Sequence, residues 1–89
     1  PEETAHLEFK EAKDTFDFSR LCEYCVALAN EGGGHLVLGV ADKLPRRVVG
    51  TSAFNRPADL ISRLFAKLHF RCDVDEVAHP DGRIVVVRV

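Results

Sequence analysis

The chain has 89 residues, of which 46% are hydrophobic, and this is enough for one small domain with a single core. No apolar run approaches the roughly 18 residues of a membrane span. No basic leader followed by an apolar stretch is present either, so we expect a cytoplasmic protein with no membrane partner. Three cysteines, an odd number, argue against a secreted disulfide scaffold. The net charge of -2 and the pI near 6.1 are not those of a simple nucleic-acid-binding protein.

The charge is distributed unevenly along the chain. Residues 1–42 carry three basic and nine acidic side chains, whereas residues 43–71 carry seven basic side chains and the single acid Asp59. A solvated face is the ordinary explanation of such a run, and a surface for a polyanion is the alternative. The chain starts without methionine and ends within the apolar run Ile84 to Val89. We therefore expect residues 1–89 to be one domain of a longer protein.

The first half of the chain predicts a strand, a helix and a second strand. Residues 6–10 alternate in polarity, which indicates a short strand with Leu7 and Phe9 turned toward the core. Asp17 or Ser19 can cap a helix that runs to about Asn30 and ends at a glycine turn. Residues 36–40 are apolar on both faces, as in a central strand. The helix stripe expected to be buried is Leu21, Cys22, Cys25, Val26, Leu28 and Ala29.

The second half predicts a strand, a second helix and a closing hairpin of two strands. Residues 43–47 indicate a loop that leads into a strand over 48–50, and a second helix begins near Asn55 with Pro57 in its first turn. Residues 72–78 and 83–89 flank the turn sequence Pro80-Asp81-Gly82. The order β-α-β-β-α-β-β predicts an α+β fold, with a mixed sheet of about five strands and two packed helices. The inward residues of the second helix are expected to be Leu60, Ile61, Leu64, Phe65 and Leu68.

Two segments carry a family resemblance. The first is Glu3-Thr4-Ala5-His6-Leu7-Glu8-Phe9-Lys10, and the second runs from Ala27-Leu28-Ala29-Asn30-Glu31-Gly32-Gly33 to Gly39-Val40-Ala41-Asp42. Together they resemble the Schlafen-type AlbA domain of RecG-related helicase-like proteins, bacterial transcriptional regulators and Schlafen proteins. The chain departs from the family at Leu28 and Glu31, where Phe and Thr are usual. The resemblance implies a Schlafen AlbA-like fold and a DNA-binding role.

The same resemblance implies a possible catalytic site. Glu3, Glu8 and Asp42 match the acids of nuclease-active Schlafen proteins, and Lys10 belongs to the same neighbourhood. Clustered carboxylates can hold Mg²⁺ or Mn²⁺ against a phosphate. Glu3 and Glu8 would point to opposite faces of one continuous strand, so they converge only if the chain bends between them. We favour the plainer interpretation, in which Glu8 pairs with a nearby cation, Asp42 shapes a turn and Glu3 is solvated.

The basic residues are the better candidates for binding. Alba-type proteins as a class grip nucleic acid with a hairpin arm, and Lys43, Arg46 and Arg47 occupy the equivalent connection here. Phosphate contacts from such residues would give modest, salt-sensitive binding. The full set predicted to bind nucleic acid is Lys10, Lys43, Arg46, Arg47, Arg63 and Lys67.

A structural zinc site is the weaker interpretation of the cysteines. Cys22 and Cys25 could join His69 and Cys72 as four ligands. The first two fall within an apolar helix stripe, however, where cysteine behaves as a small core residue. We therefore expect no bound metal.

The leading hypothesis is a nucleic-acid-binding module, with DNA favoured over RNA and no cofactor, in a larger cytoplasmic regulator or helicase-related protein. One alternative is a metal-dependent endonuclease that uses the three acids. The other is a protein-protein or self-association domain, for which the valine-rich last strand offers an edge and a homodimer is the expected product.

Overall fold

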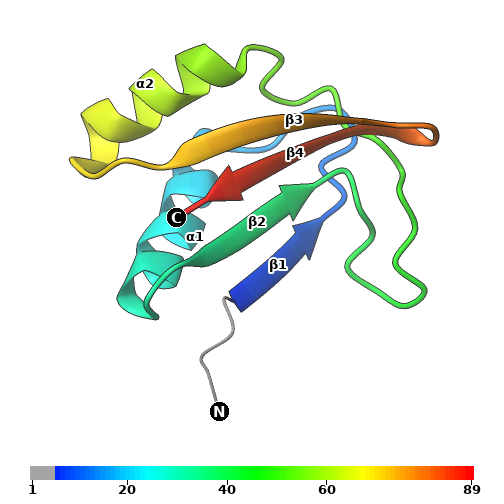
Figure 1. Ribbon diagram of the computed structural model, residues 1–89, viewed down its shortest axis with the longest axis horizontal. Coiled ribbons are helices and arrows are strands. Elements are labelled where there is room, and N and C mark those ends of the chain that lie inside the picture. Colours follow the sequence, from blue (N-terminus) through cyan, green and yellow to red (C-terminus); the bar gives the residue numbers. More distant parts are fainter. Residues whose placement is uncertain (1–5) are drawn as a thin grey trace.

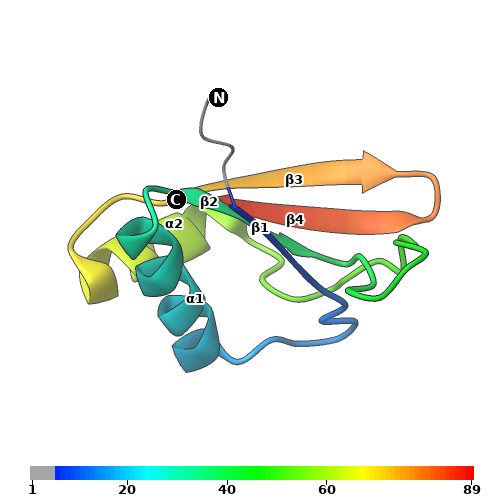
Figure 2. The same ribbon diagram turned by 90° about the horizontal axis from the view of Figure 1, so that it is seen from below.

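The computed structural model describes residues 6–89 and contains two helices and four strands in that range. In chain order they are β1 (His6–Lys10), α1 (Phe18–Asn30), β2 (Gly34–Leu38), α2 (Pro57–Leu68), β3 (Asp73–His79) and β4 (Gly82–Arg88). The strands form one mixed sheet in the order β1-β2-β4-β3, in which β1 and β2 are parallel and the other pairs antiparallel. Both helices lie on one face of this sheet (Figures 1 and 2). The α+β class with two helices is confirmed, with four strands in place of about five.

The strand predicted over residues 48–50 does not form. A single bridge joins Val40 to Val48, and the N–H groups of Val49 and Gly50 both donate to the carbonyl of Gly39. Gly39 has a φ of +102°, and a Cβ added there would lie 2.7 Å from the carbonyl oxygen of Arg83. The backbone therefore bends away from the extended conformation just after β2, and the sheet ends there.

The predicted helix ends are confirmed. The Asp17 carboxylate accepts a hydrogen bond of 2.9 Å from the backbone N–H of Arg20, which caps α1. After Asn30 the chain turns through Gly32 at a φ of +92°. Pro57 occupies the first turn of α2. Neither helix within residues 6–89 has the length and hydropathy needed to cross a bilayer.

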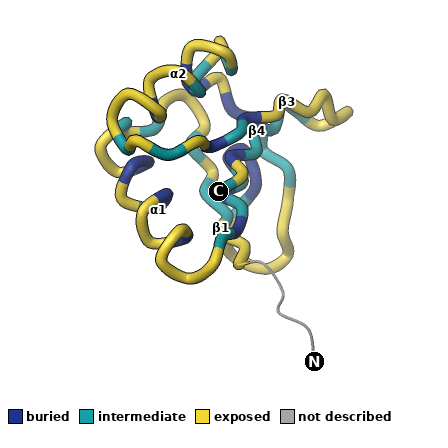
Figure 3. The backbone as a smooth tube through the Cα atoms, turned by 60° about the vertical axis from the view of Figure 1, so that its left-hand side comes forward, coloured by how far each residue is buried: buried dark blue, intermediate teal, exposed yellow. Residues whose placement is uncertain are grey.

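The core lies between the helix layer and the sheet, and Figure 3 shows that the outer sides of the helices and the tip of the β3–β4 hairpin are exposed. The buried residues of α1 and α2 are fewer than predicted, because each helix contacts the sheet along a narrow stripe only. Val26, Ala29 and Phe65 are exposed, against expectation. The buried helix residues are Leu21, Cys22, Cys25, Leu28, Leu60 and Leu64.

The predicted orientation of β1 is wrong. Leu7 and Phe9 pair with His35 and Val37 of β2, whereas Glu8 and Lys10 pair with Leu36 and Leu38. Leu36 and Leu38 are wholly buried under the helices, so Glu8 and Lys10 share the helix-covered face. Leu7 lies on the open face with 57% of its surface exposed. The alternation of polarity predicted the strand but not which of its faces points toward the helices. An edge strand at the border of the helix layer has no fully buried face, so both alternating sets of side chains are partly exposed.

The valine-rich last strand is not an edge. β4 lies between β2 and β3, so its backbone groups are already paired on both sides. The edges of the sheet are β1 and β3. The surface that suggested self-association is therefore in the interior of the sheet.

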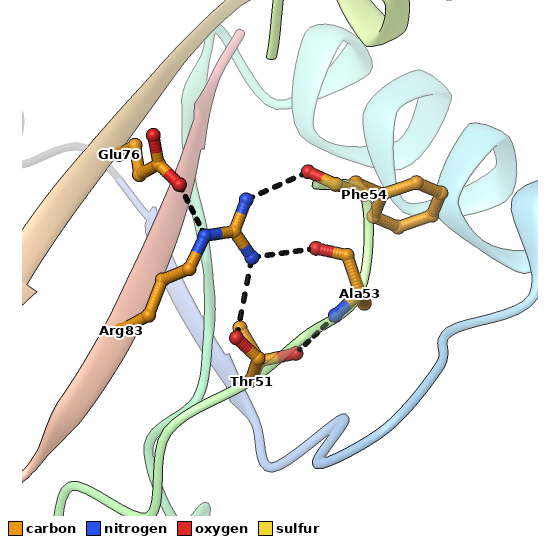
Figure 4. A network of polar contacts seen from close by, with 5 residues as sticks. All are labelled: Thr51, Ala53, Phe54, Glu76 and Arg83. Carbon is orange, nitrogen blue, oxygen red and sulfur yellow. Dashed lines mark hydrogen bonds and ion pairs between the residues drawn. The ribbon is translucent and has the colours of Figure 1, made fainter. Parts of the chain in front are cut away.

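One arginine joins the hairpin to the loop before α2 (Figure 4). Arg83 of β4 donates hydrogen bonds to the carbonyls of Thr51 at 3.2 Å, Ala53 at 2.8 Å and Phe54 at 2.8 Å. Its Nε also pairs with the carboxylate of Glu76 on β3. Thr51 in turn donates its hydroxyl to the carbonyl of Ala12, just after β1. These contacts fix the loops that follow β1 and precede α2.

Candidate nucleic-acid interface at the edge of the sheet

Lys10 is the centre of a polar group at the open edge of β1. Its side chain is on the helix-covered face, two residues beyond Glu8 on the same side of the strand. Its Nζ lies 3.8 Å from a carboxylate oxygen of Asp42. Because β1 and β2 are parallel, their carboxyl ends lie side by side at the same end of the sheet. Asp42 follows β2 by only a few residues. Asp42 therefore contacts β1 through Lys10.

Helix α1 adds two residues to this group that sequence reasoning missed. The Tyr24 ring centroid lies 5.4 Å from Nζ of Lys10 and 5.8 Å from Cζ of Arg20. The polar interaction of Tyr24 with Lys10 raises the pKa of Lys10, and the charge of Asp42 acts in the same direction. The pKa of Tyr24 is lowered, first by its interaction with Lys10 and also by Arg20. The available signal was the i, i+4 spacing of Arg20 and Tyr24, which places both on one side of a helix.

The 41–47 loop brings further cations to the end of β1. It is closed by the Val40–Val48 bridge and by a 2.8 Å hydrogen bond from the N–H of Ala41 to the carbonyl of Arg47. Arg46 donates to the carbonyl of Asp42 at 2.7 Å, and its Cζ lies 4.3 Å from the centroid of the Phe9 ring. Phe9 is on the open face of the sheet, so Arg46 and Lys10 lie on opposite sides of β1.

The six predicted binding residues therefore fall into two groups. Lys10 ends β1, and Lys43, Arg46 and Arg47 belong to the 41–47 loop, whose Arg46 contacts Phe9 of β1; we call this set the β1-end cluster. Arg63 and Lys67 lie on α2, well separated from the 41–47 loop in both ribbon views (Figures 1 and 2). Cζ of Arg63 lies 4.0 Å from the centroid of the Phe18 ring, and Lys67 lines a hollow between the two helices.

Two of the three predicted catalytic acids belong to the described part of the chain. Glu8 is exposed on the helix-covered side of β1, and Asp42 contacts Lys10 on the same edge. Glu3 lies outside the described residues. Within residues 6–89 no three His, Cys, Asp or Glu side chains are grouped so that they could hold a metal ion.

The cysteines belong to the core. Cys22, Cys25 and Cys72 are free thiols, and all three are buried in the cluster between the helices and the sheet. Burial raises the pKa of each of the three thiols. Cys72 lies beside Cys25, whereas His69 is exposed at the end of α2. The interpretation of Cys22 and Cys25 as core residues is confirmed.

A comparison with known families gives the class of domain. The profile of the family described as Schlafen, AlbA_2 matches residues 3–89, and the chain belongs to this family. Its structure is similar to a solution NMR structure of the N-terminal domain of a RecG-related protein from Nitrosomonas europaea, a protein named for its relation to an ATP-dependent DNA helicase. The two share 25% sequence identity at a TM-score of 0.65, and the match covers 100% of this chain and 65% of the other. No curated protein matches the sequence.

Proposed function

We propose that this domain binds the phosphate backbone of nucleic acid through the β1-end cluster. The observation that carries the proposal is that Lys10 contacts the Asp42 carboxylate and Arg46 the Asp42 carbonyl, while two further exposed cations, Lys43 and Arg47, belong to the same 41–47 loop. Asp42 thereby orients Lys10 and Arg46. Lys43 and Arg47 are exposed on the same loop and are free to reach a polyanion.

DNA is the proposed polyanion, in the setting of a larger cytoplasmic regulator or helicase-related protein. The likeness to a RecG-related protein supports this choice of partner and setting. Cations that meet only the backbone read no base sequence, so binding should be similar for different sequences. Three or four such contacts give weak affinity at physiological salt. Each contact contributes about 0.9 to the slope of log K against log salt for duplex and about 0.7 for single strands.

The test is fluorescence anisotropy of labelled oligonucleotides over a salt series. The double variant Arg46→Ala/Arg47→Ala should bind more weakly to all sequences, with a salt slope smaller by about 0.7 to 0.9 for each phosphate that the variant no longer neutralises. The double variant Arg63→Ala/Lys67→Ala is the matched control, because it removes the same charge from α2. Equal losses of affinity in the two double variants would show that the β1-end cluster contributes no more to binding than the cations of α2. An unchanged affinity in the loop variant would end the proposal.

A second candidate function is metal-dependent cleavage of nucleic acid. The observation in its favour is that Glu8 and Lys10 share one side of β1 and that Lys10 contacts Asp42. Two carboxylates near a phosphate-binding cation are suited to Mg²⁺ or Mn²⁺. Cleavage of labelled single-stranded DNA, duplex DNA and structured RNA would be followed with and without Mn²⁺. Turnover that needs the metal and is lost in both Glu8→Gln and Asp42→Asn would establish this activity, and metal-independent or absent turnover would reject it.

A further inference from the structure

We propose that Lys10, Arg20 and Tyr24 form a phosphate-binding subsite, which extends the nucleic-acid interface from the end of β1 onto helix α1. The ligand is the oxyanion of a phosphate group, presented by a nucleic-acid strand or as free inorganic phosphate. The assignment of the strand as ligand rests on the proposed function. The subsite itself rests on the charges and donors of these three side chains.

The two cations of this subsite have one carboxylate partner between them, Asp42, which contacts Lys10 alone of the two. Both lie against one ring, with Nζ of Lys10 at 5.4 Å and Cζ of Arg20 at 5.8 Å from the Tyr24 centroid. Within residues 6–89, the ion pair that Lys10 makes is the 3.8 Å contact with Asp42, and the Arg20 guanidinium makes none. The charge of Arg20 also acts to lower the pKa of Lys10, as expected for two neighbouring like charges. An anion between them would remove this repulsion.

Two of the three side chains, Arg20 and Tyr24, line a hollow on α1, and Lys10 reaches the Tyr24 ring from β1. The hollow is also lined by Glu23 and Ala27, and its volume is about 310 Å³. An ammonium and a guanidinium have several N–H donors and no acceptor, and the Tyr24 hydroxyl adds one O–H donor. The unprotonated oxygens of a phosphate accept hydrogen bonds, so the three groups are complementary to them. The Phe16 ring, 6.3 Å from the Tyr24 ring and tilted, supports the tyrosine from the side.

One group in the hollow opposes an anion. Glu23 lines the same space, and none of the ion pairs within residues 6–89 joins it to Arg20. A phosphate bound here therefore experiences repulsion from this carboxylate. The Glu23→Gln variant should therefore bind phosphate more tightly than the wild type. Glu23 takes part in no other contact proposed for the ligand.

The experiment is a titration of the 89-residue protein with inorganic phosphate at constant ionic strength, followed by NMR, in parallel with oligonucleotide anisotropy. Tyr24→Phe keeps the ring and removes the hydroxyl, and Arg20→Gln removes the guanidinium charge. We expect saturable shifts at Lys10, Arg20 and Tyr24 that both variants lose. Oligonucleotide affinity should fall about tenfold in each, as for the removal of one hydrogen bond to a charged group. Arg71→Gln is the matched control, because Arg71 is an exposed arginine beside the opposite edge strand, paired with Asp73.

The outcomes separate this inference from the proposed function. Phosphate shifts that persist in both variants, or that spread equally over all basic residues, would overturn the subsite. Oligonucleotide binding that depends on Arg46 and Arg47 but not on Arg20 or Tyr24 would also overturn it, while the β1-end cluster stands. A wild type that binds phosphate at Tyr24 but binds no oligonucleotide would support the subsite and refute the proposed function.

Discussion

Arg83→Met should be among the most destabilising substitutions of a partly exposed residue in this protein. The variant keeps an unbranched apolar stem in β4 but removes the guanidinium that donates to three carbonyls, those of Thr51, Ala53 and Phe54. A hydrogen bond from a charged donor contributes about 1.5 to 3 kcal/mol when its partner is shielded from water. The Arg83 side chain is 22% exposed, so water can reach part of the network and replace some of these bonds.

We therefore expect a loss of about 3 kcal/mol in the free energy of unfolding. For a domain of this size, that corresponds to a fall of roughly 15 °C in Tm. Urea unfolding followed by circular dichroism measures the first quantity and a thermal scan the second. Glu76→Gln is the control, since it removes only the ion pair with Arg83. The Glu76 side chain is 46% exposed. A half-exposed pair contributes at most about 1 kcal/mol. If Arg83→Met costs no more than Glu76→Gln, the carbonyl contacts contribute nothing and the reasoning fails.

Three further predictions concern stability. Burial raises the pKa of Cys25 above its ordinary value of 9.0, so above that pH the unfolded thiol ionises while the folded one stays neutral, and stability falls with rising pH. Cys25→Ala should make the fall of the free energy of unfolding with pH shallower, by up to about 1.4 kcal/mol per pH unit. Urea unfolding between roughly pH 8 and 10.5, the range in which thiols ionise, measures this slope. The same slope in the variant and the wild type would contradict the prediction. Leu7→Ser should lower the free energy of unfolding by less than about 1 kcal/mol, because Leu7 lies on the open face. A larger loss in urea unfolding would show that Leu7 packs in the core. Gly34→Ala should cost at least about 1 to 3 kcal/mol, because the new Cβ would meet the His6 carbonyl oxygen at 2.5 Å; a thermal scan with unchanged Tm would show that β1 moves aside freely.

The elements that the sequence predicted correctly are those with local signals. Asp17 caps α1 and a glycine turn ends it, and both features act within one turn of the helix. The terminal hairpin forms around Pro80-Asp81-Gly82 for the same reason. The prediction of a strand over 48–50 was wrong because the N–H groups of Val49 and Gly50 both donate to the carbonyl of Gly39. No local sequence rule indicates that geometry.

The site was predictable only in part, because its residues come from separate elements. The resemblance to a family pointed to Lys10 and Asp42, and these two side chains do meet. Arg20 and Tyr24 were not singled out, since only the packing of α1 beside β1 brings them to Lys10. The charge of residues 43–71 likewise concealed two separate groups, because sequence adjacency does not say that the 41–47 loop and α2 lie on different parts of the molecule.

The contacts of Arg83 also affect how variants of this domain should be interpreted. Arg83 bonds Thr51, Thr51 bonds the carbonyl of Ala12, and Ala12 follows Lys10 by two residues. A loosened hairpin would therefore shift the strand that presents Lys10, although Arg83 itself is on another element. If the domain binds DNA as proposed, a random screen for variants that fail to bind will return positions 83 and 51 beside the contact residues. Their thermal stability, measured together with their affinity, is what distinguishes a remote support from a surface that meets the ligand.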